Sequence, residues 1–171
     1  MNKNNACVLW LTGLPASGKS TLAQEVCKVL KSRGLAVEHL DGDQIRDIFP
    51  QTGFDRTSRN DHIRRIGFLA SKLEKHGVIV VASFVSPYRE SRDDVRKMCQ
   101  NFYEIYLSTP LEVCKSRDPK GLYRQAMEGK ITNFTGIQDP YEPPQQPQLV
   151  LDTSQLSVIN ARDQILGLLI S

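Results

Sequence analysis

Residues 13–20 read Gly-Leu-Pro-Ala-Ser-Gly-Lys-Ser and match the pattern G-x-x-x-x-G-K-[ST] at every fixed position. In such a loop, glycines let backbone N–H groups converge on phosphate oxygens. Lys19 would supply charge to the β- and γ-phosphates, and the Ser20 hydroxyl would reach Mg²⁺. The pattern predicts a nucleoside triphosphate site, and its expected members are Gly13, Ser17, Gly18, Lys19, Ser20 and the adjoining Thr21.

The flanking sequence places this loop between a strand and a helix. The apolar run from Cys7 to Leu11 is typical of a buried strand. From Ser20 to Arg33, apolar residues recur on one helical face, and Gly34 follows as a helix stop. Because a phosphate-binding loop of this type opens a helix directly after a strand, the context supports the motif.

The rest of the chain continues this alternation. Four further runs read as strands, namely Val37 to Leu40, Val78 to Phe84, Phe102 to Leu107 and Leu149 to Leu151. Helical stripes run from Ile63 to Leu73, closed by Gly77, and from Val158 to Leu169. This order predicts a three-layer α/β fold of the P-loop NTPase type, with a mostly parallel five-stranded sheet and helices on both faces. We expect a single domain over residues 1–171.

One stretch departs from the alternation. Residues 117–147 carry five prolines and three glycines, so no long helix or strand can run through them. A long irregular segment in a compact domain is usually disordered or a functional lid. Its Tyr123, Arg124, Phe134 and Tyr141 favour a lid that closes on a ligand.

The bulk composition narrows the class of protein. The net charge of +3 is modest and its basic residues are spread along the chain, which suits an enzyme of anionic metabolites better than a nucleic-acid binder. The four cysteines form no C-x-x-C pair, as in a reducing compartment. The polar N-terminus lacks a signal peptide's apolar core, and no stretch is apolar enough to span a bilayer. We therefore expect a cytoplasmic protein without nucleic-acid or membrane partners.

The phosphate-binding loop alone fits a kinase or a nucleotide-dependent switch protein. A GTPase switch needs a base-reading N-K-x-D motif, which the sequence lacks, and the D-x-x-G match at Asp118 lies in the proline-rich stretch. A kinase needs a group that steers the acceptor proton. Asp41 and Asp43 follow the second predicted strand, where ligands of open α/β sheets bind. The tripeptide Asp41-Gly42-Asp43 also suits a solvated turn.

Several stretches occur in the order seen in one family of P-loop kinases. They are residues 13–21, DGDQIR at 41–46, GF at 53–54, IRRIG at 63–67, SFVSPYR at 83–89, PLEVC at 110–114, RDPKGLY at 117–123, FTGI at 134–137 and DPYE at 139–142. Together they cover nearly the whole chain, and the set is very specific. The chain resembles the adenylylsulfate kinase (APS kinase) family.

The resemblance implies a reaction and its cofactors. ATP would phosphorylate the ribose 3′-hydroxyl of adenylylsulfate (APS), giving 3′-phosphoadenylylsulfate (PAPS) and ADP, as in sulfate assimilation. Ser20 and Asp41 would hold Mg²⁺, and Asp41 would also organise the acceptor hydroxyl. The family further suggests a homodimer.

The resemblance also implies an acceptor site. Asp43, Arg46 and Arg59 would contact the acceptor nucleotide, while Phe54 and Phe134 would stack on its base. Lys120 and the lid would close over the acceptor and exclude water. Ser86 stands where the family is described as forming a phosphoserine; direct transfer needs no such relay, and a substrate contact or a turn suits this serine better.

The sequence departs from the family pattern at several positions. Pro15 and Ala16 lie inside the phosphate-binding loop, and Ser20 replaces the usual threonine, which keeps a hydroxyl for Mg²⁺. Where the family has Asp-Arg and then Asn, this chain has Ser58, Arg59 and His62. An imidazole offers hydrogen bonds in a different geometry from an amide. A second acceptor class therefore stays open, namely another nucleotide anhydride such as cytidine diphosphoramidate.

Overall fold

The computed structural model describes residues 6–48 and 53–169. The N-terminal stretch that argued against a signal peptide therefore lies outside the described residues, apart from Ala6. Within the described ranges, no helix combines the length and the apolar character needed to cross a membrane.

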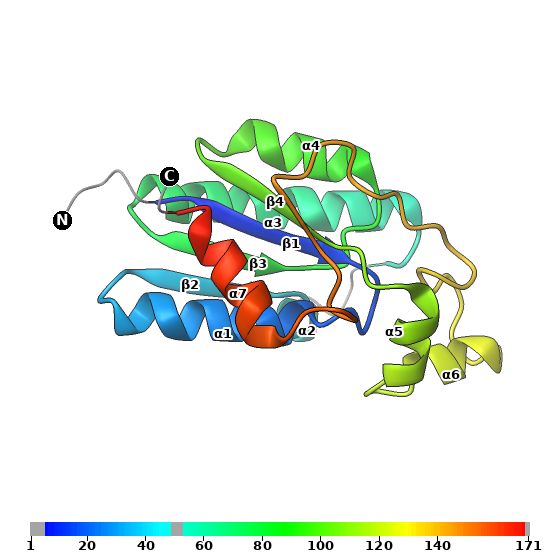
Figure 1. Cartoon of the computed structure of the whole chain (residues 1–171). Helices are drawn as coiled ribbons and strands as arrows, with labels where there is room; N and C mark the ends of the chain where they lie inside the picture. Colours follow the sequence, from blue (N-terminus) through cyan, green and yellow to red (C-terminus); the bar gives the residue numbers. More distant parts are fainter. Residues whose placement is uncertain (1–5, 49–52, 170–171) are drawn as a thin grey trace.

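A five-stranded, wholly parallel sheet forms the middle layer (Figure 1). Its strands are β1 (Val8–Gly13), β2 (Val37–Asp41), β3 (Ile79–Ser83), β4 (Phe102–Leu107) and β5 (Leu149–Leu151), in the order β2-β3-β1-β4-β5. Every neighbouring pair runs parallel. The predicted fold class and all five strands are confirmed.

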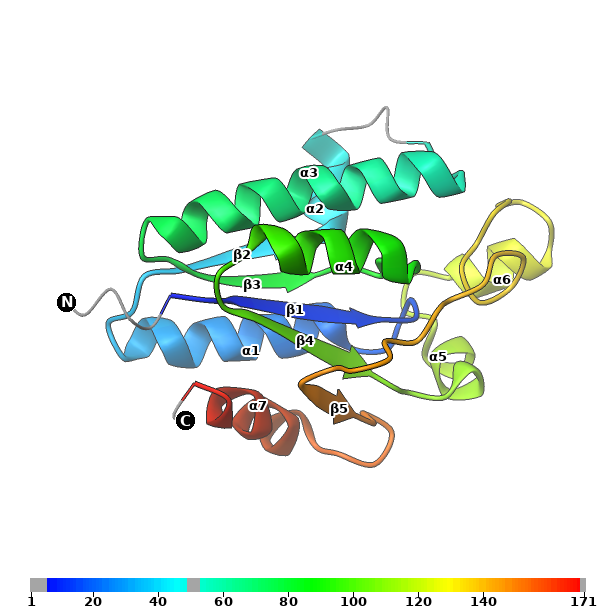
Figure 2. The same ribbon diagram turned by 90° about the horizontal axis from the view of Figure 1, so that it is seen from above.

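Helices cover both faces of the sheet. Figures 1 and 2 show α1 (Lys19–Ser32) and α7 (Val158–Gly167) on one side, and α3 (Arg56–Lys75) and α4 (Arg89–Met98) on the other. The side chains of β1 alternate between the two cores, because successive strand residues point to opposite faces. Leu9 and Leu11 pack with α1 and α7, whereas Val8 and Trp10 pack with α3 and α4.

Three short helices gather at the carboxyl end of the sheet. They are α2 (Gly42–Ile48), α5 (Leu111–Arg117) and α6 (Leu122–Met127), and α5 and α6 stand at the right of Figure 1. Of the expected lid, residues 117–147, only α6 and the last residue of α5 are helical, so the expectation of no long element holds.

The tripeptide at residues 41–43 is not a solvated turn, and that alternative is wrong. Asp41 is the last residue of β2, and α2 begins at the next residue. A Cβ at Gly42 would lie 3.2 Å from both the Ser83 carbonyl oxygen and the Phe84 ring, so a glycine suits this close approach. The immediate entry into α2 fixes both aspartates at the carboxyl end of the sheet.

Candidate functional site

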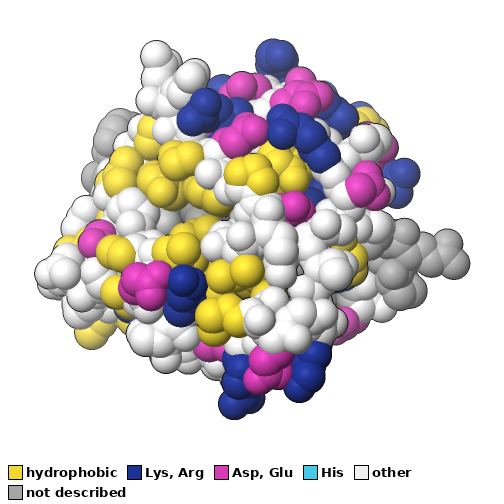
Figure 3. All heavy atoms as spheres, turned by 90° about the vertical axis from the view of Figure 1, so that its right-hand side faces the viewer, with side chains coloured by type: hydrophobic (Ala, Val, Ile, Leu, Met, Phe, Trp, Pro, Cys, Tyr) yellow, Lys and Arg dark blue, Asp and Glu magenta, His cyan; other side chains and the backbone are white. Residues whose placement is uncertain are grey.

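A cavity of about 1090 Å³ opens at the carboxyl end of the sheet. Its walls come from the phosphate-binding loop, α2, the start of α3, residues 83–87 and the lid. Single-ligand pockets measure roughly 300–1,000 Å³, so the space is large enough for two ligands. Figure 3 views the molecule from this side, where hydrophobic side chains interrupt the charged surface.

Most of the expected site residues line this one cavity. They are Gly18, Lys19, Ser20, Thr21, Asp41, Asp43, Arg46, Phe54, Arg59, His62, Ser86, Lys120 and Phe134. Gly13 and Ser17 lie behind its wall instead. A Cβ at Gly13, whose φ is +154°, would meet the Leu107 carbonyl oxygen at 2.7 Å, so this glycine serves the packing of the loop against β4.

Lys19 is held inside the phosphate-binding loop. Its Nζ donates to the carbonyl oxygens of Gly13 and Leu14 at 3.0 and 2.7 Å, and to Ser17 Oγ at 3.3 Å. Burial lowers the pKa of Lys19 to about 8, against the opposing effect of nearby groups that include Asp43 and Asp41. A phosphate placed at this ammonium would find a charge that the protein itself leaves only partly compensated.

Asp41 lies beside the first residues of α1. Its Oδ2 accepts from Ser20 Oγ at 2.6 Å and from Ser83 Oγ at 2.8 Å, while Oδ1 accepts from the Asp43 N–H at 3.0 Å. Burial by itself raises the pKa of Asp41, but these hydrogen bonds outweigh it and hold the pKa below its usual value. The carboxylate therefore stays ionised although it is buried.

The Asp41 carboxylate and the Ser20 hydroxyl form an all-oxygen donor set that fits Mg²⁺. Within residues 6–48 and 53–169, no three His, Cys, Asp or Glu side chains cluster closely enough to hold a metal. Mg²⁺ commonly takes one or two carboxylates and completes its shell with substrate phosphates and water. The residues present therefore suit a magnesium ion that arrives with a nucleotide.

Arg46 presents an incompletely hydrogen-bonded guanidinium to the other half of the cavity. Its guanidinium lies over the Phe54 ring, 4.6 Å from the centroid. The Nη1 atom is buried and has no hydrogen-bond partner in the described part of the chain. Burial and then the neighbouring Arg59 lower the pKa of Arg46. An anionic group would relieve both the unpaired donor and the repulsion between the two guanidinium groups.

His62 is buried beside this arginine. Its ring meets Phe84 edge-on, with centroids 6.2 Å apart. Burial lowers the pKa of His62, and the charges of Arg46 and Arg65 lower it further. The imidazole is therefore neutral at physiological pH and offers one donor and one acceptor.

Arg59 is tied to the lid. Its Nη1 donates to Thr135 Oγ1 at 2.7 Å, and Nη2 lies 3.4 Å from the Asp139 carboxylate and also donates to the Asn133 carbonyl. The side chain is only 8% exposed. Arg59 thus borders the cavity near Arg46 while it anchors residues 133–139 of the lid.

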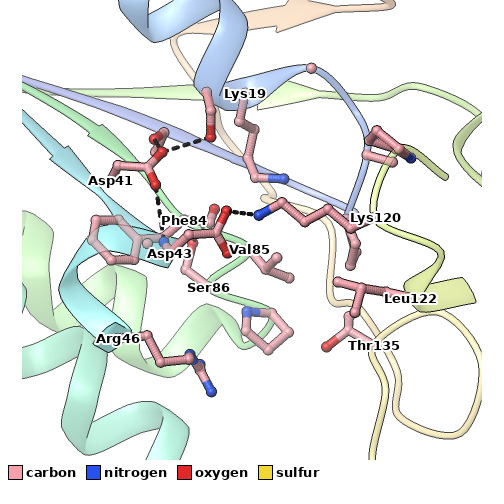
Figure 4. A pocket seen from close by; sticks show the side chains of 18 of the residues that line it. Lys19, Asp41, Asp43, Arg46, Phe84, Val85, Ser86, Lys120, Leu122 and Thr135 are labelled. Carbon is pink, nitrogen blue, oxygen red and sulfur yellow. Dashed lines mark hydrogen bonds and ion pairs between the residues drawn. The ribbon is translucent and has the colours of Figure 1, made fainter. Parts of the chain in front are cut away.

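The lid meets the opposite wall through further contacts. Figure 4 shows Lys120 pointing at Asp43, with which it forms an ion pair, and Lys19 beside them. Phe134 packs edge-on against Tyr123, with ring centroids 5.0 Å apart. The Tyr123 hydroxyl donates to the Pro15 carbonyl at 3.0 Å, which links the lid to the phosphate-binding loop.

Ser86 is buried, and its hydroxyl is engaged within the protein. Oγ accepts from Trp10 Nε1 at 3.1 Å and donates to Thr12 Oγ1 at 3.0 Å. Its φ of +38°, just before Pro87, is rare for a residue with a side chain. These contacts make Ser86 part of the wall and favour positioning over covalent chemistry.

Ser83, the Asp41 partner, did not emerge from the sequence. It lies at the end of β3, a strand buried along its whole length, and its hydroxyl, which donates to Asp41, accepts a hydrogen bond from His39 Nε2 at 3.0 Å. Nothing in a continuous buried run distinguishes one hydroxyl that faces a neighbouring strand's carboxylate. The parallel register that places Ser83 opposite Asp41 supplies that information.

The chain is similar to known proteins along nearly all of its length. A family model described as "Adenylylsulphate kinase" matches residues 5–152. The adenylyl-sulfate kinase of Synechococcus sp. (strain JA-3-3Ab) is 48% identical over 159 residues, which are 92% of this chain and 90% of that protein. The structure of the Mycobacterium tuberculosis APS kinase in complex with AMPPNP and APS superposes with a TM-score of 0.93 at 36% identity, covering 98% of this chain and 99% of the other.

Proposed function

The chain belongs to the adenylylsulphate kinase family, and we propose that it transfers the γ-phosphoryl group of ATP to the 3′-hydroxyl of adenylylsulfate, giving PAPS and ADP. The observation that carries this function is a single cavity with two unlike halves. One half is a phosphate-binding loop with Lys19, and the other presents the Arg46 guanidinium beside aromatic rings, with an Nη1 atom that has no hydrogen-bond partner among the described residues. Such a space suits two anionic nucleotides whose reacting groups meet in the middle.

The donor half would hold ATP with Gly18, Lys19, Ser20 and Thr21. Ser20 and Asp41 would supply oxygen ligands to Mg²⁺, which neutralises charge on the β- and γ-phosphates when bound. Lys19 Nζ would exchange its contacts with loop carbonyls for phosphate oxygens. Because phosphoryl transfer depends mostly on positioning and charge, these groups suffice on the donor side.

The acceptor half would orient the nucleotide for in-line attack. Arg46, whose Nη1 atom has no hydrogen-bond partner in residues 6–48 and 53–169, suits the phosphosulfate anion, and Phe54 and Phe134 offer flat faces to the base. The ionised Asp41 carboxylate would accept a hydrogen bond from the attacking hydroxyl. Arg59 and His62 would complete the wall around the sugar and the base.

The lid would exclude water during transfer. Lys120 and Asp43 pair across the cavity mouth, and both side chains are exposed, so an arriving anion can draw Lys120 inward and leave Asp43 to contact the acceptor. Ser86 would contribute by shaping the wall next to the acceptor. Residues 117–147 thus act as the lid of one domain that spans residues 1–171.

The test is acceptor-dependent ADP formation with magnesium present. Adenylylsulfate should support turnover at micromolar to millimolar concentration, the range of ordinary KM values. Cytidine diphosphoramidate, offered in parallel, should give far less ADP. Turnover with the cytidine compound alone would reassign the acceptor and leave the kinase chemistry in place. ADP release that is indifferent to any acceptor would instead point to a nucleotide-dependent switch.

We also propose a homodimer that works in the cytoplasm. Phe68 and Leu69 are neighbouring apolar side chains on α3 that are 57% and 43% exposed, as expected of a surface that a second subunit covers. The four free cysteines fit a reducing compartment. Sedimentation at micromolar concentration should give twice the 19.3 kDa chain mass, and a monomer would refute the dimer.

A further inference from the structure

Arg92 on α4 is a fully buried arginine outside the cavity wall. The side chain is 1% exposed, and all three of its nitrogens donate hydrogen bonds. Nε donates to Glu104 Oε1 at 2.8 Å, Nη1 to the Ser86 carbonyl at 2.5 Å, and Nη2 to the Glu142 carbonyl at 2.6 Å. Arginine is seldom buried to this degree unless each donor has a partner.

The two carbonyl groups belong to different parts of the cavity's framework. Ser86 is in the loop that lines the acceptor half. Glu142 lies in the lid, and its N–H donates to the Pro87 carbonyl at 2.8 Å. One rigid guanidinium therefore joins the lid to residues 83–87, which are called the acceptor loop below.

The same junction reaches the strand that leads into the phosphate-binding loop. The Tyr141 ring centroid lies 5.7 Å from Arg92 Cζ, and the Tyr141 hydroxyl is 2.9 Å from Thr12 Oγ1. Thr12 also accepts from the Ser86 hydroxyl and donates to the Val85 carbonyl at 2.8 Å. Strand β1, the loop that follows β3 and the lid thus meet in one buried hydrogen-bond network.

The backbone of Ser86 needs such support. A non-glycine residue at φ +38° that precedes a proline occupies a sparsely populated conformation. Strained conformations persist where surrounding contacts over-determine them. The hydrogen bond from Arg92 Nη1 to the Ser86 carbonyl acts on the strained unit itself.

We propose that Arg92 is a positioning residue for phosphoryl transfer. It fixes the acceptor loop and the lid at Glu142 in one geometry, and in this way it sets the affinity for the acceptor. The inference deepens the proposed kinase function and rests on it. Arg92 touches neither nucleotide site, and it acts through the Ser86 and Glu142 carbonyl groups. Glu104 balances its charge.

The test is the variant Arg92→Lys beside the matched control Arg96→Lys. Lysine keeps the charge opposite Glu104 but cannot span three separate acceptors. Arg96 also pairs with Glu104, at 2.7 Å, yet contacts neither Ser86 nor Glu142. Arg92→Lys should raise the acceptor KM about tenfold or more, since small misplacements of reacting groups are costly. The ATP dissociation constant without acceptor should stay within about twofold of wild type, because Arg92 bonds to Glu104, Ser86 and Glu142 and not to the phosphate-binding loop, so the loop is not misplaced.

The outcomes separate a positioning role from a structural one. If both variants lose a similar amount of thermal stability and keep the wild-type acceptor KM, Arg92 only stabilises the fold and the inference is overturned. If Arg92→Lys does not fold, the variant Tyr141→Phe provides the test, because it removes one hydroxyl from the same hydrogen-bond network. Tyr141→Phe should raise the acceptor KM severalfold. An unchanged acceptor KM in this variant overturns the inference. Failure of wild type to turn over adenylylsulfate would count against the proposed function instead.

Discussion

The Asp41 carboxylate is a buried charge that the protein keeps ionised. Two hydroxyl groups and two backbone N–H groups hydrogen-bond to it, and they keep it ionised against the cost of burial. Asp41→Asn keeps the shape and loses the charge. We expect kcat to fall about 100-fold or more, as for other single catalytic groups.

The control for this variant is Asp47→Asn, which alters an exposed aspartate on α2 that does not line the cavity. Steady-state kinetics of both proteins, with circular dichroism to verify folding, would compare them. A folded Asp41→Asn enzyme with wild-type kcat would remove this residue from the mechanism.

His62 links stability to pH. The folded protein holds the pKa of His62 below its ordinary value of 6.5, through burial first and then the charges of Arg46 and Arg65. As pH falls below that value, the unfolded chain takes up a proton that the folded chain refuses, so the free energy of unfolding declines until the folded pKa is reached. Wild type should therefore lose more stability between pH 7 and pH 5 than His62→Asn does.

Urea titrations at each pH would measure this difference. His76→Asn is the matched control, because His76 lies exposed at the end of α3 and does not line the cavity. Equal slopes for wild type and His62→Asn would mean that the buried imidazole titrates normally.

At the scale of elements, strands were readable from sequence and several helices were not. Each strand is a short apolar run, and burial between two helical layers leaves no ambiguity of face. Helix α4 has one buried aliphatic residue, Val95, together with buried Ser91 and Arg92. The inward face of α4 is polar because it meets Glu104 and the lid. The sequence therefore shows no apolar stripe from which this helix could be predicted.

The place of residues 13–20 between β1 and α1 was likewise predictable, because the motif is local to eight consecutive residues. The bonds from Arg59 to Thr135 and Asp139 were not, since they join α3 to a lid segment more than 70 positions away. Pairings of this kind depend on how far the lid folds back over the sheet. The sequence signals the lid's composition but not its partners.

The lid supplies the next prediction. Phe134 lines the cavity and rests edge-on against Tyr123, so one ring face is available to a base. Stacking of an aromatic side chain on a base contributes about 1–3 kcal/mol. Phe134→Ala should raise the acceptor KM by about tenfold, which lies within that range, and should leave the ATP KM nearly unchanged. Ile159→Ala removes an exposed apolar side chain on α7 that does not line the cavity and serves as control; an acceptor KM common to both variants would exclude stacking.

For the whole molecule, the decisive feature is that both halves of one cavity are built at the carboxyl end of one parallel sheet. The phosphate-binding loop follows β1, Asp41 ends β2, and the acceptor loop follows β3. Parallel strands bring these three segments to one edge whatever their separation in sequence. A ligand in the cavity therefore contacts several elements at once and should stabilise the entire fold.

This coupling gives a prediction for unfolding of the intact protein. Magnesium and ATP at 100 times the dissociation constant should add about 2.7 kcal/mol to the free energy of unfolding. For a chain of this length, that is a rise in Tm of about 5–10 °C. Lys19→Ala should abolish the rise, because Lys19 is the loop's charged side chain and would contact the β- and γ-phosphates. Lys28→Ala, an exposed change on the same helix, should retain it. Calorimetric scans with and without nucleotide measure the Tm of both variants. A wild-type Tm that does not change with ATP would contradict ATP binding at the phosphate-binding loop, and with it the proposed phosphoryl transfer.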